Sequence, residues 1–101
     1  MSIYMAPTKF ARVVSIDETQ KRLGHLVMLQ RQSLRMTQDQ LATRSGLTQS
    51  QICRFENKGK MTYDIFMRAC RGLDLCAWAT LRVAEDSKAY AEACSVKARM
   101  N

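Results

Sequence analysis

The stretch TQDQLATRSGLTQSQICRFEN, residues 37–57, decides which fold this sequence predicts. Thr37 and Thr48 are residues that favour the start of a helix, because their hydroxyl oxygens accept hydrogen bonds from the first free backbone N–H groups. Gly46 favours the end of one, because glycine adopts the left-handed conformation without a steric cost. We therefore expect two short helices joined by a tight turn and crossing steeply. The expected helices cover residues 38–45 and 49–57.

The same stretch is rich in glutamine, serine, asparagine and arginine outside its apolar positions. Lysine and glutamate would make a better-solvated helix surface. A glutamine amide carries an acceptor and donors on one plane, which suits a partner that also presents paired donors and acceptors. The alternative is a polar, solvated face that happens to contain glutamine.

Helical patterns also flank this stretch. The segment Ser15–Glu18 fits a capping box, with Ser15 as the cap and Glu18 reaching back to it, and a helix with periodic apolar residues should run from there to Arg35. Thr62 is expected to cap a further helix that ends in the turn at 72–74.

The remainder of the chain divides around this centre. Residues 1–14 are expected to form an arm, residues 15–75 the main domain, and residues 76–101 an extension. From Leu75 into the extension, apolar and other residues alternate, which favours a strand, while an alanine-rich helix through Ala84 is the alternative. Ser87 should cap a last helix.

The composition favours a polyanionic partner. The chain has 101 residues, a formal charge of +7 and a pI near 9.6, although many solvated surfaces are also basic. No apolar run approaches the roughly 18 residues that span a bilayer, and the first residues do not resemble a secretory signal. We expect a cytoplasmic protein with no membrane partner.

Catalytic chemistry finds no support in the sequence. The cysteines and the single histidine show no zinc-binding spacing, and paired catalytic carboxylates or a phosphate-binding glycine loop are not evident. We expect no enzyme activity, no catalytic residue, no metal site and no cofactor. These cysteines are most simply free thiols: Cys53, Cys70, Cys76 and Cys94.

Placed in a 20-residue frame that begins at Gln38, the residues Ala42, Gly46 and Ile52 occupy positions five, nine and fifteen. This pattern resembles the lambda-repressor-like family, also called the XRE family, of helix-turn-helix regulators. The similarity extends over residues 23–75 and includes LGHLVMLQRQ before the frame and FEN at its end. Lys58 departs from it, since the family usually passes directly from asparagine to glycine.

The resemblance implies an all-α, lambda-repressor-like bundle that inserts helix 49–57 into the major groove of double-stranded DNA, and it assigns roles to residues. It implies a structural ion pair between Arg31 and Glu56, and a brace between Gln38 and Gln49. The residues implied to contact bases are Gln49, Ser50 and Arg54. Those implied to contact phosphate are Gln38, Arg44, Thr48, Asn57, Lys58 and Lys60. Such proteins normally bind palindromic operators as homodimers, so a nucleoid-associated repressor of its own gene is the expected function.

The extension supplies a second reading. An expected strand after residue 75 would have an unpaired edge, which pairing with the same strand of a second chain would satisfy. Trp78, Leu81 and Val83 would then form the dimer interface; simple packing of Trp78 on its own domain is the alternative. This arrangement is similar to that of HipB-type antitoxins, which implies a kinase-like toxin of the HipA type as a possible protein partner.

Overall fold

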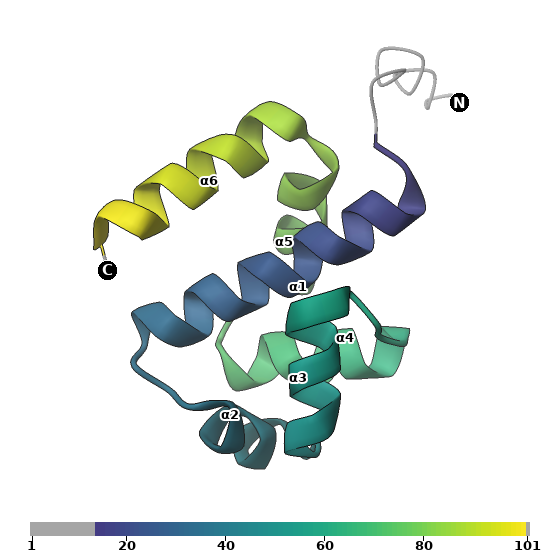
Figure 1. The fold of residues 1–101 in the computed structure, drawn as a ribbon, viewed down its shortest axis with the longest axis vertical. Coiled ribbons are helices and arrows are strands. Elements are labelled where there is room, and N and C mark those ends of the chain that lie inside the picture. Colours follow the sequence, from purple (N-terminus) through teal and green to yellow (C-terminus); the bar gives the residue numbers. More distant parts are fainter. Residues whose placement is uncertain (1–13, 101) are drawn as a thin grey trace.

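The computed structural model describes residues 14–100, and the side chains of residues 14–96 (Figure 1). The expected arm, residues 1–14, therefore lies outside the described residues except for Val14. The described residues are all-helical and contain no strand, which confirms the expected all-α class. Their helices are α1 (Ile16–Ser33), α2 (Gln38–Ser45), α3 (Gln49–Lys58), α4 (Tyr63–Gly72), α5 (Ala77–Glu85) and α6 (Ser87–Met100). None of the described helices is long and apolar enough to cross a membrane.

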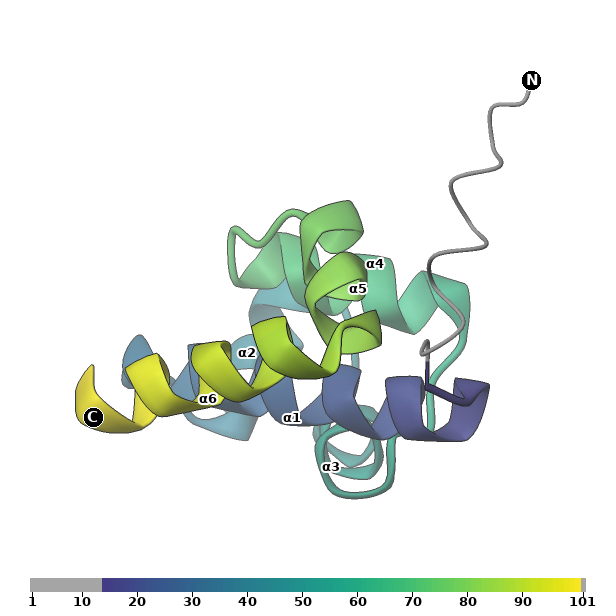
Figure 2. The ribbon, with the colours of Figure 1, turned by 90° about the horizontal axis from the view of Figure 1, so that it is seen from above.

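The longest helix, α1, organises the molecule. It packs against α3 on one side and against α5 and α6 on the other (Figure 1). The short helices α2 and α4 pack on each other, and α2 also contacts α3. Viewed from above, α4 and α5 lie on the same side of α1 (Figure 2). As a result α3 is supported by α1 and α2, and one side of α3 is left exposed.

Side-chain caps start the helices where the sequence predicts them. Hydroxyl oxygens of Ser15, Thr37, Thr48 and Thr62 each accept a hydrogen bond from a backbone N–H three residues later, at 3.1–3.2 Å. At Thr37 and Thr48 the box is complete, because a glutamine three residues later accepts from the backbone N–H of the threonine. These caps fix where α2 and α3 begin.

Two caps differ from the sequence prediction. Glu18 does not reach back to Ser15; its carboxylate accepts a hydrogen bond from Arg22 Nε at 3.2 Å. Asp86 rather than Ser87 caps α6, because Asp86 Oδ1 accepts from the backbone N–H groups of Lys88 at 3.0 Å and Ala89 at 3.2 Å. A carboxylate is a strong acceptor and stabilises the positive end of a helix.

Two glycines end α2 and α3. Gly46 and Gly59 both have φ of 69°, the left-handed conformation. Gly59 is constrained further, since a Cβ atom there would lie 2.8 Å from the backbone N of Lys21. Lys58, which departs from the family pattern, is accommodated as the last residue of α3. The loop after α3 is therefore held against the start of α1.

The core is one cluster of buried apolar side chains shared by α1 to α5. Phe55 of α3 and Phe66 of α4 meet edge to face near its centre, with ring centroids 6.3 Å apart. The buried members are Leu23, Leu26, Val27, Leu41, Ala42, Ile52, Phe55, Phe66, Ala69, Cys70, Leu73 and Ala84. Because Ala84 belongs to α5, the extension contributes to the same core as the main domain.

The expected strand after residue 75 was wrong, because these residues form α5. The alternating pattern places Trp78 and Thr80 on the same face, but in the structure Trp78 is 69% exposed and Thr80 is 8% exposed. Thr80 and the fully buried Ala84 are four residues apart, which is the spacing of one helix face. The Thr80 hydroxyl donates to the carbonyl of Cys76 at 2.8 Å, so its burial within a helix leaves no polar group unpaired. The expected dimer sheet required this strand, which the described residues do not form.

The substitution Gly24→Ala tests the contact between α1 and α3. Alanine normally stabilises a helix relative to glycine by about 1 kcal/mol. Here its Cβ would overlap the carbonyl oxygen of Phe55 in α3. We expect a net loss of about 1–3 kcal/mol in the free energy of unfolding, measured by urea denaturation. An unchanged or raised stability would contradict this close approach.

Candidate functional site

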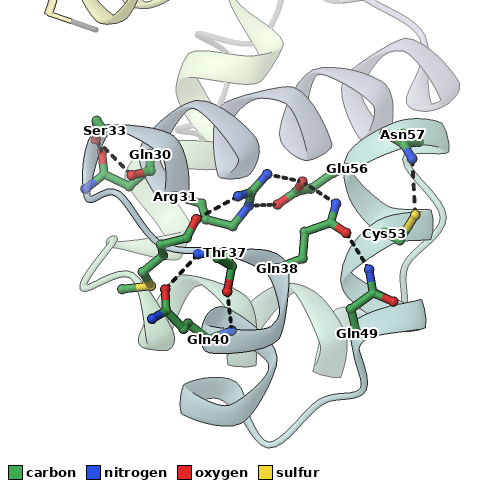
Figure 3. A network of polar contacts seen from close by, with 11 residues as sticks. Gln30, Arg31, Ser33, Thr37, Gln38, Gln40, Gln49, Cys53, Glu56 and Asn57 are labelled. Atoms are coloured by element: carbon green, nitrogen blue, oxygen red, sulfur yellow. Dashed lines mark hydrogen bonds and ion pairs between the residues drawn. The ribbon is translucent and has the colours of Figure 1, made fainter.

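A network of polar contacts joins α1, α2 and α3 (Figure 3). Arg31 Nε donates to Glu56 Oε2 at 2.7 Å and Arg31 Nη2 donates to Glu56 Oε1 at 2.9 Å, so the ion pair expected from the sequence is present and bidentate. The Glu56 side chain is 1% exposed and that of Arg31 is 12% exposed. Arg31 also donates to the carbonyl of Met36 at 2.7 Å, which anchors the loop between α1 and α2.

Two glutamines extend this network of hydrogen bonds from Glu56 to the start of α3. Gln38 Nε2 donates to Glu56 Oε1 at 3.0 Å, and Gln49 Nε2 donates to Gln38 Oε1 at 2.6 Å. The brace between Gln38 and Gln49 is therefore present, while the contact from Gln38 to Glu56 was not anticipated. The first residue of α2 and the first residue of α3 are in this way tied to a buried carboxylate.

The exposed side of α3 carries the residues implied to contact bases. Gln49, Ser50 and Arg54 are all exposed, as is Asn57, whose Nδ2 donates to Cys53 Sγ at 3.2 Å. Ile52 and Phe55 of the same helix are fully buried, so α3 has one apolar side and one polar side. This division fixes which side chains of α3 can meet a partner.

A basic groove adjoins this side of α3. It has a volume of about 610 Å³ and lies between the start of α1, α3 and the loop that leads to α4. Asp17 is the one carboxylate among the described residues that line it. The cationic residues that line it are Lys21, Arg54, Lys58 and Lys60. An arrangement of this kind suits an anionic ligand.

Lys21 was not predicted from the sequence to belong to this site. It lies in α1, far along the chain from the other cations of the groove, and no local pattern distinguishes it from a solvated lysine. The close approach of Gly59 to the backbone of Gln20 and Lys21 brings it to the groove. Only that tertiary contact could have identified it.

The other residues implied to bind phosphate occupy different places. Thr48 is exposed, and its hydroxyl caps α3 by accepting from Gln51. Arg44 is exposed in the last turn of α2 but does not line the basic groove. Arg44 is therefore not brought together with Lys58 and Lys60 at that groove.

Part of the glutamine enrichment in residues 37–57 has a structural explanation. Gln40 and Gln51 complete the capping boxes of α2 and α3, accepting from backbone N–H groups at 2.8 and 2.9 Å. The Gln38 side chain donates to Glu56 and accepts from Gln49. Recognition is therefore not needed to explain every glutamine, and Gln49 is the one that best suits contact with a partner.

The titratable groups with displaced pKa values lie away from this face. Burial raises the pKa of the Cys70 thiol to about 12, and the neighbouring Cys76 adds to the effect. Burial also raises the pKa of Tyr90 to about 12; the neighbouring Cys94 adds to the effect, while the positive charge of Arg22 opposes it. The Arg22 guanidinium lies 4.8 Å above the Tyr90 ring and helps to hold α6 on α1. The side chains described include no cluster of histidine, cysteine or carboxylates suited to a metal ion.

The residues assigned to a dimer interface differ in exposure. Trp78 is exposed on α5, whereas Leu81 and Val83 are half-buried and pack against the core. Their expected role assumed a strand, whereas they lie on the helix α5. Packing of Trp78 on its own domain is also not observed, given its exposure.

Comparisons of the chain with protein-family models, with curated proteins and with solved structures found no match.

The double substitution Arg31→Met/Glu56→Met tests the buried ion pair. Removing one partner should cost about 3–5 kcal/mol of unfolding free energy, because it leaves a buried charge without its counterion. We expect the double variant to be more stable than either single variant in urea denaturation. The exposed pair Arg68–Asp64, with 51% and 70% side-chain exposure, is the matched control, and Arg68→Met should cost less than about 1 kcal/mol. Equal effects at the two pairs would contradict the role of burial.

Proposed function

We propose that this protein is a sequence-specific, double-stranded DNA-binding transcriptional regulator that places α3 in the major groove. The observation that carries the proposal is the exposed side of α3, where glutamine, serine and arginine stand together above a buried, braced network and beside a basic groove. The arrangement of α2, the turn at Gly46 and α3 supports it, as does the resemblance of residues 23–75 to helix-turn-helix regulators.

The base contacts follow from the chemistry of the exposed side chains. Arginine donates two hydrogen bonds to the O6 and N7 atoms of guanine, and glutamine pairs with the N6 and N7 atoms of adenine. We assign Arg54 to a guanine and Gln49 to an adenine, with Ser50 between them on the same exposed side. Gln49 and Ser50 lie at the start of α3, the part of a recognition helix that approaches base edges, and Arg54 lies one turn further along on the same exposed side.

The phosphate contacts follow from charge. Lys21, Lys58 and Lys60 line the groove beside Arg54, and Glu56, the acidic residue of α3, is buried and neutralised by Arg31. The nearby exposed surface is therefore strongly positive, in line with the formal charge of +7. Contacts of this kind set the register of α3 on the duplex, while the base contacts supply the sequence preference.

A homodimer on a palindromic operator completes the proposal. One recognition helix spans only about half a turn of DNA, and two copies related by a two-fold axis double the length that is read. The antitoxin alternative, with a HipA-like toxin as partner, rested on similarity to a tail that contains a strand. Since α5 occupies those positions, nothing in the described residues favours that alternative.

The proposal is tested by a mobility shift with the DNA directly upstream of the gene, against a scrambled duplex, at two salt concentrations. We expect binding to the upstream duplex that survives near-physiological salt, and binding to the scrambled duplex that is lost there, because nonspecific binding is almost entirely electrostatic. Equal, salt-sensitive binding to both duplexes would contradict a sequence-specific regulator.

Lys21→Ala tests the contribution of the basic groove. Loss of one phosphate contact should lower the slope of log Kobs against log salt by about 0.9 and weaken binding to every sequence by the same factor. Fluorescence anisotropy on the specific and scrambled duplexes measures both quantities. Lys88→Ala, an exposed lysine in the first turn of α6, is the control and should leave the slope unchanged. An unchanged slope for Lys21→Ala would show that Lys21 does not contact the DNA.

Arg54→Ala tests the recognition side of α3. We expect a loss of about 1–3 kcal/mol on the preferred site and a relaxed preference at one base pair, because a bidentate contact to guanine is removed. Arg82→Ala, an exposed arginine on α5, is the matched control for the loss of one positive charge. Equal losses for the two variants would mean that Arg54 contributes charge alone.

A further inference from the structure

We infer that Glu56 is a positioning residue for base discrimination: through Gln38 it fixes which end of the Gln49 amide faces the DNA. This inference rests on the proposed function and concerns the same face. It assigns Glu56 a role beyond the stability of the ion pair, although Glu56 itself is buried and touches no DNA.

The donor–acceptor direction of these hydrogen bonds is set by the Glu56 carboxylate. Paired with Arg31, the Glu56 carboxylate only accepts hydrogen bonds, so any amide that bonds it must present its nitrogen. Gln38 Nε2 lies 3.0 Å from Glu56 Oε1. The opposite orientation would place the amide oxygen of Gln38 against a negatively charged oxygen at the same distance, which is repulsive.

The orientation of Gln38 then dictates that of Gln49. With its nitrogen directed at Glu56, Gln38 presents its oxygen to Gln49, and Gln49 Nε2 donates to it at 2.6 Å. An amide oxygen requires a donor, so Gln49 must direct its nitrogen toward Gln38. The second N–H of Gln38 stays available for a phosphate oxygen.

The result is a fixed arrangement of hydrogen-bond donor and acceptor on the exposed Gln49 side chain. Gln49 retains its carbonyl oxygen and its second N–H for a partner, one acceptor beside one donor in a set order. Adenine presents the complementary pair in the major groove, a donor at N6 and an acceptor at N7, whereas guanine presents two acceptors. A carboxylate buried in the domain thereby favours adenine over guanine at the base pair that Gln49 meets.

A purely structural role for Glu56 would give a different result for base preference. If Glu56 only stabilised the fold, a folded variant that lacks the link from Gln38 would bind more weakly but would keep its base preference. If Glu56 sets the amide order, the same variant loses preference at the base pair of Gln49 and at no other. The ratio of affinities, rather than the affinity itself, separates the two roles.

The experiment first selects preferred sites for the wild-type protein from a randomised duplex library, and Gln49→Ala then identifies the base pair that Gln49 reads. Affinities for the four possible base pairs at that position are measured for the wild type, Glu56→Gln and Gln38→Met. Glu56→Gln replaces the obligate acceptor by an amide that can present either end, and Gln38→Met breaks the chain while the ion pair of Arg31 remains intact. If the Glu56→Gln variant does not fold, the same affinities are measured with Gln38→Met.

Matched controls separate charge and side-chain type from position. Glu92→Gln makes the same charge change on the exposed surface of α6, and Gln32→Met makes the same side-chain change on the exposed surface of α1. We expect Glu56→Gln and Gln38→Met to lower the adenine preference about five- to ten-fold, within the range that one bidentate contact supplies. Both controls should retain it.

A second measurement needs no DNA. In the free wild-type protein, the side-chain amide protons of Gln49 should have chemical shifts distinct from those of solvated glutamine, and Gln38→Met should return them to solvated values. Unchanged preference in a folded Gln38→Met variant, or solvated shifts for Gln49 in the wild type, would overturn the inference alone. If the library yields no preferred site for the wild type, the proposed function fails with it.

Discussion

The bidentate ion pair between Arg31 and Glu56 is the interaction on which the rest of the site depends. It joins the end of α1 to the end of α3, and through Met36 and Gln38 it also anchors the loop before α2 and the first residue of α2. A buried pair of this kind contributes little to net stability compared with apolar packing, because both ions lose their hydration. Its value here is geometric, since it specifies how three helices meet and removes a negative charge from the face beside the basic groove.

Local signals predicted most of the fold. The threonine caps, Gly46 and the apolar spacing place α2 and α3 within one residue of their observed ends, because each signal acts within a few residues of the helix terminus that it controls. Residues 75–84 could not be assigned in this way. Their sequence fits both the alternation of a strand and the spacing of a helix, and the burial of Thr80 and Ala84 where α5 packs on α1 and α4 decides between them.

The candidate site was predicted only in part, because some of its contacts depend on tertiary packing. The resemblance supplied Gln49, Ser50 and Arg54, which share the exposed side of α3, and supplied the ion pair and the glutamine brace. It did not supply Lys21, which reaches the groove through the contact of Gly59 with α1, or the link from Gln38 to Glu56. Both depend on residues far apart in sequence, and no spacing within one helix encodes them. Gln40 and Gln51, conversely, are explained by capping rather than recognition.

We propose above all that the exposed side of α3 and the adjoining groove are the surface that meets duplex DNA. The most direct test is a titration of isotopically labelled protein with a duplex that carries the preferred site, followed through the backbone and side-chain amide resonances. We expect the largest changes at residues 48–60, at the side chains of Gln38 and Gln49 and at Lys21, with α6 unaffected. Changes concentrated on α5 and α6, with α3 unperturbed, would contradict it.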